Sequence, residues 1–556
     1  MSDDAGTMPT FPETHEVINQ PPPLEGLNLY ESDQALREAV HREQGGWAEP
    51  QLAEYGALAG GEMMELGFQA NRYPPVLQAY DRFGHRIDEV EYHPAYHRLM
   101  EIGVSRGIHS LPWSEPRPGA HVARAAMMYL HVQAEAGTAC PLSMMFAGIP
   151  TLRHQPEVAE WWMPRVLSRE YDPRNLPADQ KAGITLGMAL TEKQGGSDVQ
   201  ANTTRAYPLG TPGPGQSYAL VGHKWFCSAP MSDAFLVTAR TEQGLCCFLM
   251  PRWKPEGTRN AFHILRLKDK LGNRANASGE VEFRGACAIM IGPEGKGVRT
   301  IIEMVAMTRF DCLVASAGVM RQALVQALHH CAHRQAFGKL LIDQPLMQNV
   351  LADLAVETEA ALALGMRVAR ALDAAEAGES ERLFLRLAIP VGKYWVCKRT
   401  PVLVGEALEC LGGNGYVEES LLPRLYREAP LNSIWEGSGN VQCLDVLRAI
   451  SRSPEALDAF IEEIRQGQGA NRRLDAYVTE VENELADREQ WEYRARRLVE
   501  RMAIALQATL LVRHAPAAVA DAFCASRLEE NVGRAFGTLP RRADVRAILE
   551  RARPAH

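Results

Sequence analysis

Apolar and polar positions change their spacing along this chain in a way that divides it into four parts. From about residue 32 to 170, apolar residues recur every three or four positions, as in SDQALREAVHREQ and HVARAAMMYLHVQAEAG, which predicts helices. From about residue 182 to 290, short β-rich runs such as ITLGMAL, AFLVTAR and LCCFLM alternate with Gly, Pro and Asn, which predicts a compact β domain. Helical spacing returns from residue 297 to about 450, and a helical segment rich in Arg and Glu follows.

This order of helical, β, helical and helical segments predicts an α+β fold class. The predicted parts are a Pro-rich N-terminal extension, a helical domain, a central β domain, a helical bundle and an additional Arg-rich helical domain. Their expected boundaries are residues 1–30, 31–181, 182–290, 291–450 and 451–556.

Composition narrows the class of protein. Apolar residues make up 46% and charged residues 23% of the 556 positions, which is typical of a soluble globular protein. No apolar run approaches the roughly 18 residues that a membrane helix needs. The acidic, Pro-containing start MSDDAGTMPTFPETHE does not resemble a secretory signal, and the eleven cysteines lack CxxC spacing. We therefore expect a cytoplasmic protein with reduced thiols and no membrane partner.

Two pairs of histidines have a spacing that metal sites also use. His93 and His97 lie four residues apart, as do His329 and His333. No carboxylate or cysteine clearly completes either set, so structural or solvent-facing histidines are the simpler interpretation. We expect no metal.

The run MALTEKQGGSD, residues 188–198, indicates a loop at the end of a strand that binds a polar ligand. Two hydroxyl residues, Thr191 and Ser197, flank a Gly-Gly pair directly after the apolar run. Phosphate is one candidate ligand, but neither GxxxxGK[ST] nor GxGxxG occurs in the chain. The loop alone does not identify what it holds.

Two signatures in their usual order give the chain a strong resemblance to the acyl-CoA dehydrogenase family. The first is AL-TEKQGGSD at the head of the β domain, and the second is ECLGGNGYVEESLLPRLYRE near the end of the helical bundle. The family's RxxFG motif is also present at residues 334–338, as is its GxEGxG loop at residues 292–297. The resemblance covers roughly residues 35–450 and implies the acyl-CoA dehydrogenase fold, in which an N-terminal helical domain, a β domain and a four-helix bundle follow one another.

The resemblance implies that the loop binds FAD, with hydroxyl and backbone N–H groups facing the flavin. In the family, a Trp covers the flavin and a hydroxyl residue lies near its reactive nitrogen, which here are Trp225 and Ser228. Taken alone, Trp225 would more commonly be a half-buried strand aromatic. The cofactor-binding residues that the resemblance implies are Met188, Thr191, Gly196, Ser197, Trp225, Phe226, Cys227, Ser228, Arg334, Phe337, Ile434, Trp435, Gly437, Ser438, Gly439 and Asn440.

The same resemblance assigns the catalytic base to Glu436, in the run IWEGSGN. Family members remove the acidic α-proton of an acyl-CoA with a carboxylate while the β-hydride goes to the flavin. Some members place this carboxylate one residue before an Arg of the helix that follows the GxEGxG loop. Thr308, before Arg309, occupies that position here, so Glu436 has no rival. The simpler alternative for Glu436 is a solvated surface carboxylate.

A closer resemblance spans almost the whole chain. The runs INQPPPLEGLNLYESD, RLKDKLGNRANAS and NSIWEGSGN are similar to those of the adaptive-response flavoproteins of alkylation stress, a branch of this family that binds double-stranded DNA and is linked to protection from alkylating agents. Departures from the common family pattern make turnover of ordinary fatty acyl-CoA less certain. They are Trp435 in place of Tyr, Ala306 in place of Asp and Glu409 in place of Gln.

The charge of the last segment is opposite to that of the rest. Residues 491–556 contain twelve arginines, no lysine and seven acids, a surplus of five positive charges, whereas the whole chain carries −9 and the remainder therefore −14. Arg494, Arg497 and Arg501 would share one face of a helix, and Arg541, Arg542 and Arg546 belong to a second cluster. Guanidinium groups suit phosphate contacts, so duplex DNA is a candidate partner, while a solvated face with Glu–Arg pairs is the commoner explanation of such a charge run.

Two functions remain open, and a third, non-enzymatic version of the first is a DNA-shielding protein whose FAD is structural. The first is an FAD-dependent, DNA-binding flavoprotein of the alkylation-response branch that keeps a dehydrogenase site. The second is a metabolic acyl-CoA dehydrogenase whose C-terminal segment serves assembly. Family members complete each FAD site with the Arg of RxxFG from a neighbouring subunit, so the resemblance also implies a homo-oligomer, expected to be a tetramer, with an acyl-CoA-like small molecule as substrate.

Overall fold

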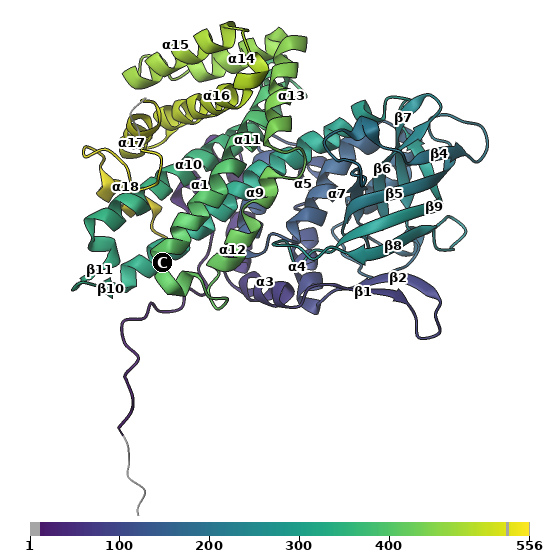
Figure 1. Ribbon diagram of the computed structural model, residues 1–556, viewed down its shortest axis with the longest axis horizontal. Coiled ribbons are helices and arrows are strands. Elements are labelled where there is room, and N and C mark those ends of the chain that lie inside the picture. The colour runs from purple at the N-terminus through teal and green to yellow at the C-terminus, as the bar shows by residue number, and fades with distance from the viewer. Residues whose placement is uncertain (1–11, 530–532, 555–556) are drawn as a thin grey trace, which may run out of the picture.

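The computed structural model describes residues 12–529 and 533–554. Figure 1 shows a helical body with a β domain packed at one side and a layer of C-terminal helices above it. Helical and β segments follow the predicted order, so the α+β fold class is confirmed.

The N-terminal helical part surrounds one central helix. Its helices are α1 (Gln34–Arg42), α2 (Glu49–Gly60), α3 (Glu62–Arg72), α4 (Pro94–Ser105), α5 (Leu111–Ser114), α6 (Ala120–Ala134), α7 (Ala139–Leu152) and α8 (Pro156–Val166). Every residue of α6 is buried, which is typical of a helix enclosed by its neighbours and not of an amphipathic surface helix.

A two-stranded hairpin interrupts this helical part, and the apolar spacing did not predict it. Its strands β1 (Val76–Tyr80) and β2 (Arg86–Glu91) pair antiparallel. Pro74 and Pro75 end the preceding helix, since proline cannot continue a helix, and the DRFGH turn reverses the chain. The hairpin lies beneath the β domain, and Asp88 Oδ1 accepts a hydrogen bond of 2.8 Å from the Ile264 backbone N–H.

The β domain consists of β3 (Leu186–Ala189), β4 (Arg205–Pro208), β5 (Ser217–Ser228), β6 (Ala234–Thr241), β7 (Gly244–Pro251), β8 (Phe262–Leu267) and β9 (Ser278–Ile291). Pairing runs from β6 through β4, β5, β9 and β7 back to β6, so the sheet closes on itself. β3 pairs parallel with β6, and β8 pairs antiparallel with β9. The run LCCFLM in β7 is buried on both faces, which explains why it is continuously apolar instead of alternating.

Four helices form the body of the bundle. They are α9 (Gly297–His333), α10 (Pro345–Ala374), α11 (Glu379–Cys410) and α13 (Gly439–Arg452). α9 packs against α6, α7, α10 and α11, and therefore joins the N-terminal helices to the bundle. A small hairpin, β10 (Gln335–Ala336) and β11 (Lys339–Leu340), links α9 to α10, and the short helix α12 (Leu422–Glu428) precedes α13.

The C-terminal helices cover the outer side of the bundle. They are α14 (Pro454–Arg465), α15 (Arg472–Ala486), α16 (Trp491–His514), α17 (Ala517–Arg527) and α18 (Val545–Ala552). α16 lies between α15 and the bundle helices α10, α11 and α13, and α18 packs on α10 and α1. Short 3-10 helices occur at residues 46–48, 178–180, 199–201, 341–343, 412–415 and 431–433.

Within residues 12–529 and 533–554, no helix is long and apolar enough to cross a membrane. The same residues contain no group of three or more His, Cys, Asp or Glu side chains arranged to hold a metal ion.

Candidate functional site

The loop after β3 is built around a buried ion pair. Glu192, 1% exposed, accepts a hydrogen bond of 2.8 Å from Lys224 Nζ of β5 and one of 2.6 Å from the Thr203 backbone N–H. Lys224 also donates to the backbone carbonyls of Leu190 and Thr238. Burial raises the pKa of the Glu192 carboxyl, but the Lys224 ammonium and these hydrogen bonds lower it overall, to about 2. Glu192 therefore remains ionised at neutral pH. Its buried charge holds the loop in shape and does not face a ligand.

The other side of this loop carries small and hydroxyl groups. Thr191 is half-buried and Ser197 is exposed, and the Thr191 carbonyl accepts a hydrogen bond of 2.8 Å from the Trp225 N–H, which joins the loop to β5. A side chain at Gly196 would place its Cβ 2.8 Å from Thr191 Oγ1. A larger residue here would push against the Thr191 side chain, so glycine lets the loop backbone lie close to the Thr191 hydroxyl.

The end of β5 adds an aromatic wall beside the loop. The Trp225 ring lies under the ammonium of Lys268, with Nζ 3.4 Å from the ring centroid, and Phe226 is 50% exposed. The predicted cofactor residue Cys227 has a fully buried side chain, because β5 alternates its faces at this point. Cys227 therefore does not present its thiol to a ligand, contrary to the prediction.

Cys140 belongs to this site, and sequence reasoning missed it. The thiol lies at the start of α7, and burial raises its pKa to about 11 while a hydrogen bond with Ser228 lowers it. Charges near the thiol include Lys270, Glu436 and Glu428. Cys140 therefore lies between the end of β5 and the loop that carries Glu436, although no sequence motif marks it.

Glu436 is half-buried and receives a hydrogen bond from α9. Thr308 Oγ1 donates to Glu436 Oε2 at 2.6 Å, a short bond of the kind that charged acceptors form. Glu436 has a φ of 57°, an uncommon conformation for a residue with a long side chain. The surrounding structure must fix this conformation, since an isolated chain would avoid it.

Three buried side chains hold the Glu436 backbone in place. Arg309 Nε donates to the Glu436 carbonyl at 2.9 Å, and Gln442 Nε2 donates to the carbonyls of Glu436 and Gly437. Lys393, 1% exposed, donates to the carbonyls of Asn432, Trp435 and Gly437. These residues lie on α9, α13 and α11, so the bundle itself positions the loop. Neither Lys393 nor Gln442 was predicted, because a single Lys or Gln in a helix gives no pattern.

The rest of the predicted run borders this loop. Ile434 is 62% exposed, whereas Trp435 is half-buried and donates from Nε1 to Asn432 Oδ1 at 2.9 Å. Gly439 is buried against Lys398 and Tyr394. Asn440 is exposed, and its Oδ1 accepts a hydrogen bond of 2.7 Å from Arg496 of α16. The C-terminal helices therefore reach the edge of the site.

Two predicted cofactor residues lie elsewhere. Arg334 and Phe337 belong to the β10–β11 hairpin at the end of the bundle, whereas the loop after β3 lies in the β domain on the opposite side of the molecule (Figure 1). Within one chain they do not meet the other predicted cofactor residues.

Comparisons with known proteins agree with this architecture. The model of the AidB N-terminal domain matches residues 19–173, and those of the acyl-CoA dehydrogenase middle and C-terminal domains match residues 187–286 and 295–451. AidB of Escherichia coli (strain K12) is 47% identical over 94% of this chain and 96% of its own length. The chain belongs to the acyl-CoA dehydrogenase family.

Further relatives support the same membership. Acyl-CoA dehydrogenase family member 11 of Caenorhabditis elegans is 31% identical over 84% of this chain and 76% of its own length. The structure of C. elegans ACDH-11 in complex with C11-CoA has a TM-score of 0.84 at 27% identity, and covers 98% of this chain and 94% of that chain. Membership in the acyl-CoA dehydrogenase family assigns FAD as cofactor and oxidation of a CH–CH group as the class of reaction.

The residues present fit a flavin of the acyl-CoA dehydrogenase type. The loop after β3 offers the Thr191 hydroxyl close to Gly196, the end of β5 exposes the apolar ring of Phe226, and the Glu436 loop exposes Ile434. Such a combination suits a flat ring system with polar edges. FAD, when bound, would supply the hydride acceptor.

Most arginines of the C-terminal segment are already paired. Arg494, Arg497 and Arg501 lie on α16 as predicted, but they form ion pairs with Asp487, Glu484 and Glu480 at 3.0, 2.9 and 2.5 Å. These acids belong to α15 and to the turn before α16. The shared face is therefore an interface between two helices, and its charges are largely compensated.

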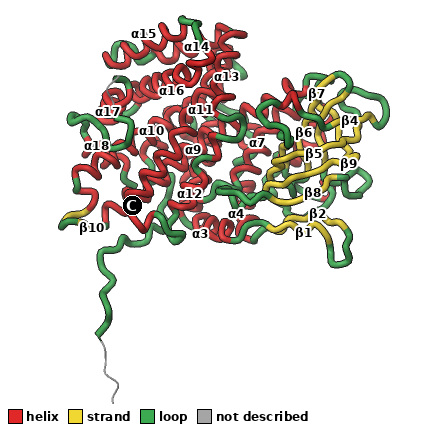
Figure 2. Tube along the Cα trace, viewed as in Figure 1, coloured by secondary structure: helices red, strands yellow, loops and turns green. Residues whose placement is uncertain are grey.

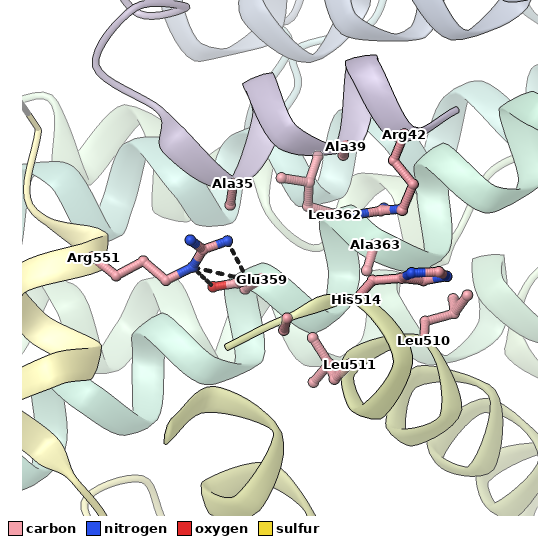
Figure 3. Close-up of a pocket in the computed structure, with 11 residues that line it drawn as sticks. Ala35, Ala39, Arg42, Glu359, Leu362, Ala363, Leu510, Leu511, His514 and Arg551 are labelled. Atoms are coloured by element: carbon pink, nitrogen blue, oxygen red, sulfur yellow. Dashed lines mark hydrogen bonds and ion pairs between the residues drawn. The ribbon is translucent and has the colours of Figure 1, made fainter. Parts of the chain in front are cut away.

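Other arginines of this segment anchor it to the acidic body. Arg551 of α18 pairs with Glu359 of α10 and with Glu38 of α1, as Figure 3 shows for Glu359. Arg527 pairs with Asp353 and Glu357. Part of the positive charge of residues 491–556 is thus used in ion pairs with the negatively charged remainder of the chain.

The second predicted cluster is more open. Arg541 and Arg542 are exposed, and within the described part of the chain no ion pair involves either of them. Arg546 is 88% exposed and pairs with Glu550 one turn away.

We expect Thr308→Val to slow dehydrogenation about 10- to 100-fold. The loss of a hydrogen bond to a charged group costs roughly 1.5–3 kcal/mol, and the carboxylate becomes free to rotate. The rate of flavin reduction by an acyl-CoA under anaerobic conditions measures this effect. Thr308→Ser keeps the hydroxyl and should restore most of the rate. An unchanged rate in Thr308→Val would show that the contact does not position Glu436.

Proposed function

We propose that this chain is a flavoprotein of the AidB type that oxidises an acyl thioester with Glu436 as the base and binds duplex DNA through its C-terminal segment. The observation that carries the enzymatic part is the contact of Thr308 with the Glu436 carboxylate, within a loop that three buried side chains fix. A solvated surface carboxylate would have no such support. The protection from alkylating agents that the resemblance implies is part of this proposal, as is a cytoplasmic location.

The substrate class is an acyl-CoA. Support comes from the C. elegans structure with C11-CoA, which resembles this chain along almost its whole length. Trp435 lies where family members commonly carry Tyr, and its Nε1 donates a hydrogen bond to Asn432. A ring larger than that of Tyr is therefore held at the edge of the proposed substrate position. We therefore propose a narrower acyl slot than that of ordinary family members.

Anaerobic titration of the yellow holoprotein with a panel of acyl-CoAs, with and without duplex DNA, tests the proposal. A thioester substrate bleaches the flavin absorbance near about 450 nm. DNA that changes the rate or the preferred chain length would connect the two activities. No bleaching by any thioester would contradict the enzymatic part.

We propose that the protein assembles as a homotetramer in which Arg334 and Phe337 contact the FAD of a neighbouring chain. The separation of these residues from the β-domain loop within one chain supports the assignment. Phe337 is 99% exposed, which is unusual for a large apolar side chain unless another surface covers it. Light scattering should give about four times the mass of a 61.5 kDa chain.

We propose that duplex DNA contacts the second arginine cluster more than the first. Arg541 and Arg542 have exposed guanidinium groups without a carboxylate partner among the described residues, whereas Arg494, Arg497 and Arg501 would have to leave ion pairs. Guanidinium–phosphate contacts do not distinguish bases, so little sequence preference is expected.

The double variant Arg541→Ala, Arg542→Ala should weaken binding to every duplex about equally. The slope of the logarithm of the binding constant against the logarithm of salt concentration should become shallower by about 1.8, since each lost phosphate contact removes about 0.9. Fluorescence anisotropy across several salt concentrations measures both. The matched variant with Ala at Arg494, Arg497 and Arg501 should change DNA affinity less and lower thermal stability more. Equal DNA binding by parent and double variant would refute this assignment.

One observation favours the second candidate function, a metabolic acyl-CoA dehydrogenase whose C-terminal helices serve assembly. Arg501, Arg527 and Arg551 are largely buried in ion pairs with the body and with α15. Parent protein that shows no affinity for a duplex of roughly 30 base pairs at low salt, where phosphate contacts are strongest, would favour this alternative.

A further inference from the structure

The hairpin that carries Arg334 has an unusual conformation. Phe337 and Gly338 form the turn between β10 and β11 with φ values of 52° and 77°. A phenylalanine with positive φ is uncommon, because its side chain makes this backbone conformation unfavourable. The Phe337 ring is 99% exposed, so packing against the described residues of its own chain does little to offset this cost. Other contacts must therefore hold the hairpin.

The N-terminal extension supplies these contacts. Asn19 Nδ2 donates to the Gln335 carbonyl at 3.0 Å, and Asn19 Oδ1 accepts from the Gln335 N–H at 2.7 Å. The side-chain amide of Asn19 thus pairs with β10 as a neighbouring strand would. Nearby, the Pro22 carbonyl accepts a hydrogen bond of 2.8 Å from His329 Nε2 of α9. These contacts join residues more than 300 positions apart in sequence.

Asn19 also contacts Arg334 directly. Arg334 Nη1 donates to the Asn19 backbone carbonyl at 2.6 Å. Within the described residues no carboxylate pairs with Arg334, so its charge and its remaining N–H groups are available to an anion. Asn19 has a φ of 58°, and asparagine tolerates this conformation better than other residues except glycine. The local sequence therefore suits the geometry that the contact needs.

We propose that Asn19 is a positioning residue for the cofactor site of a second copy of this chain. Its amide fixes the hairpin, and its carbonyl orients the Arg334 guanidinium towards the phosphates of the neighbour's FAD. The inference rests on the proposed assembly, in which Arg334 acts on a neighbouring chain. The N-terminal extension then contributes to cofactor affinity without touching the cofactor.

The test uses full-length protein stripped of FAD and titrated with FAD, with flavin fluorescence as the readout. Asn19→Gly keeps the positive φ and removes both amide hydrogen bonds. We expect about tenfold weaker FAD binding, because a guanidinium that is no longer preorganised loses conformational entropy on binding. Asn19→Asp keeps an acceptor for the Gln335 N–H and should recover part of the affinity. Gln20→Gly, in the same exposed segment, should bind FAD as the parent does.

A double-mutant cycle separates positioning from a general structural effect. In an Arg334→Ala background, Asn19→Gly should cause no further loss of FAD affinity, because the Asn19 amide holds the hairpin and acts on FAD only through Arg334. An equal additional loss in that background, or parent-like affinity of Asn19→Gly, would overturn the inference. Light scattering of the parent tests the assembly independently. A single-chain mass with tightly bound FAD would overturn both proposals, whereas an oligomer with an unaffected Asn19→Gly variant overturns only the positioning role.

Discussion

Glu436→Gln should slow reduction of the flavin by an acyl-CoA on the order of 100-fold or more, the scale of lost general-base catalysis, while FAD stays bound. Glutamine keeps the size of the side chain and can still accept a hydrogen bond from Thr308. The loop should remain in place, because Arg309, Gln442 and Lys393 hold it through backbone carbonyls and not through the carboxylate. Stopped-flow absorbance under anaerobic conditions measures the rate.

Glu419→Gln is a suitable control, because it neutralises an exposed carboxylate of the second signature away from the Thr308 contact. Its rate should equal that of the parent. If Glu436→Gln and the parent reduce the flavin at the same rate, Glu436 is not the base.

Lys224→Met should destabilise the β domain by about 3–5 kcal/mol, the usual cost of breaking one side of a buried ion pair. The change leaves the Glu192 carboxylate buried without its cation and removes the hydrogen bonds to the Leu190 and Thr238 carbonyls. Because Glu192 shapes the TEKQGGSD loop, FAD should be released at a lower temperature as well. Thermal unfolding followed by circular dichroism and flavin fluorescence measures both effects.

Lys193→Met provides the matched control, since Lys193 is exposed in the same loop. It should leave the unfolding temperature nearly unchanged. Adding Glu192→Gln to Lys224→Met should recover part of the lost stability, because the uncompensated charge is then gone. A Lys224→Met variant as stable as the parent would show that the pair does not hold the loop.

The order of helical and β segments could be predicted from the sequence, because the spacing of apolar residues indicates which face of a helix or strand is buried. The spacing in VRTIIEMVAMTRFDC predicts the helix that is observed as α9, and LCCFLM predicts β7. The β1–β2 hairpin was missed, since its strands are short and half-exposed and leave little apolar alternation. Contacts with the β domain stabilise this hairpin, and the local spacing of apolar residues does not indicate such contacts.

Only part of the site could be predicted from the sequence, for the same reason. Glu436 and the TEKQGGSD loop were marked by motifs, and their resemblance to a family gave them roles. Cys140, Lys393 and Gln442 became visible only when the fold brought α7, α11 and α13 to one place. The sequence correctly predicts that the arginines of the first cluster share one face of α16. It does not predict their partners on α15, because a charge pattern on one helix does not identify the helix that packs against it.

The most direct test of the central claim is exchange of the α-hydrogens of an acyl-CoA with solvent deuterium. The holoprotein is incubated anaerobically with excess thioester in D₂O, and the recovered thioester is analysed by mass spectrometry. If Glu436 takes the α-proton, deuterium should enter the α-carbon with the parent and on the order of 100-fold more slowly with Glu436→Gln. Equal exchange by both proteins, or none above background with any thioester by the parent, would contradict the account.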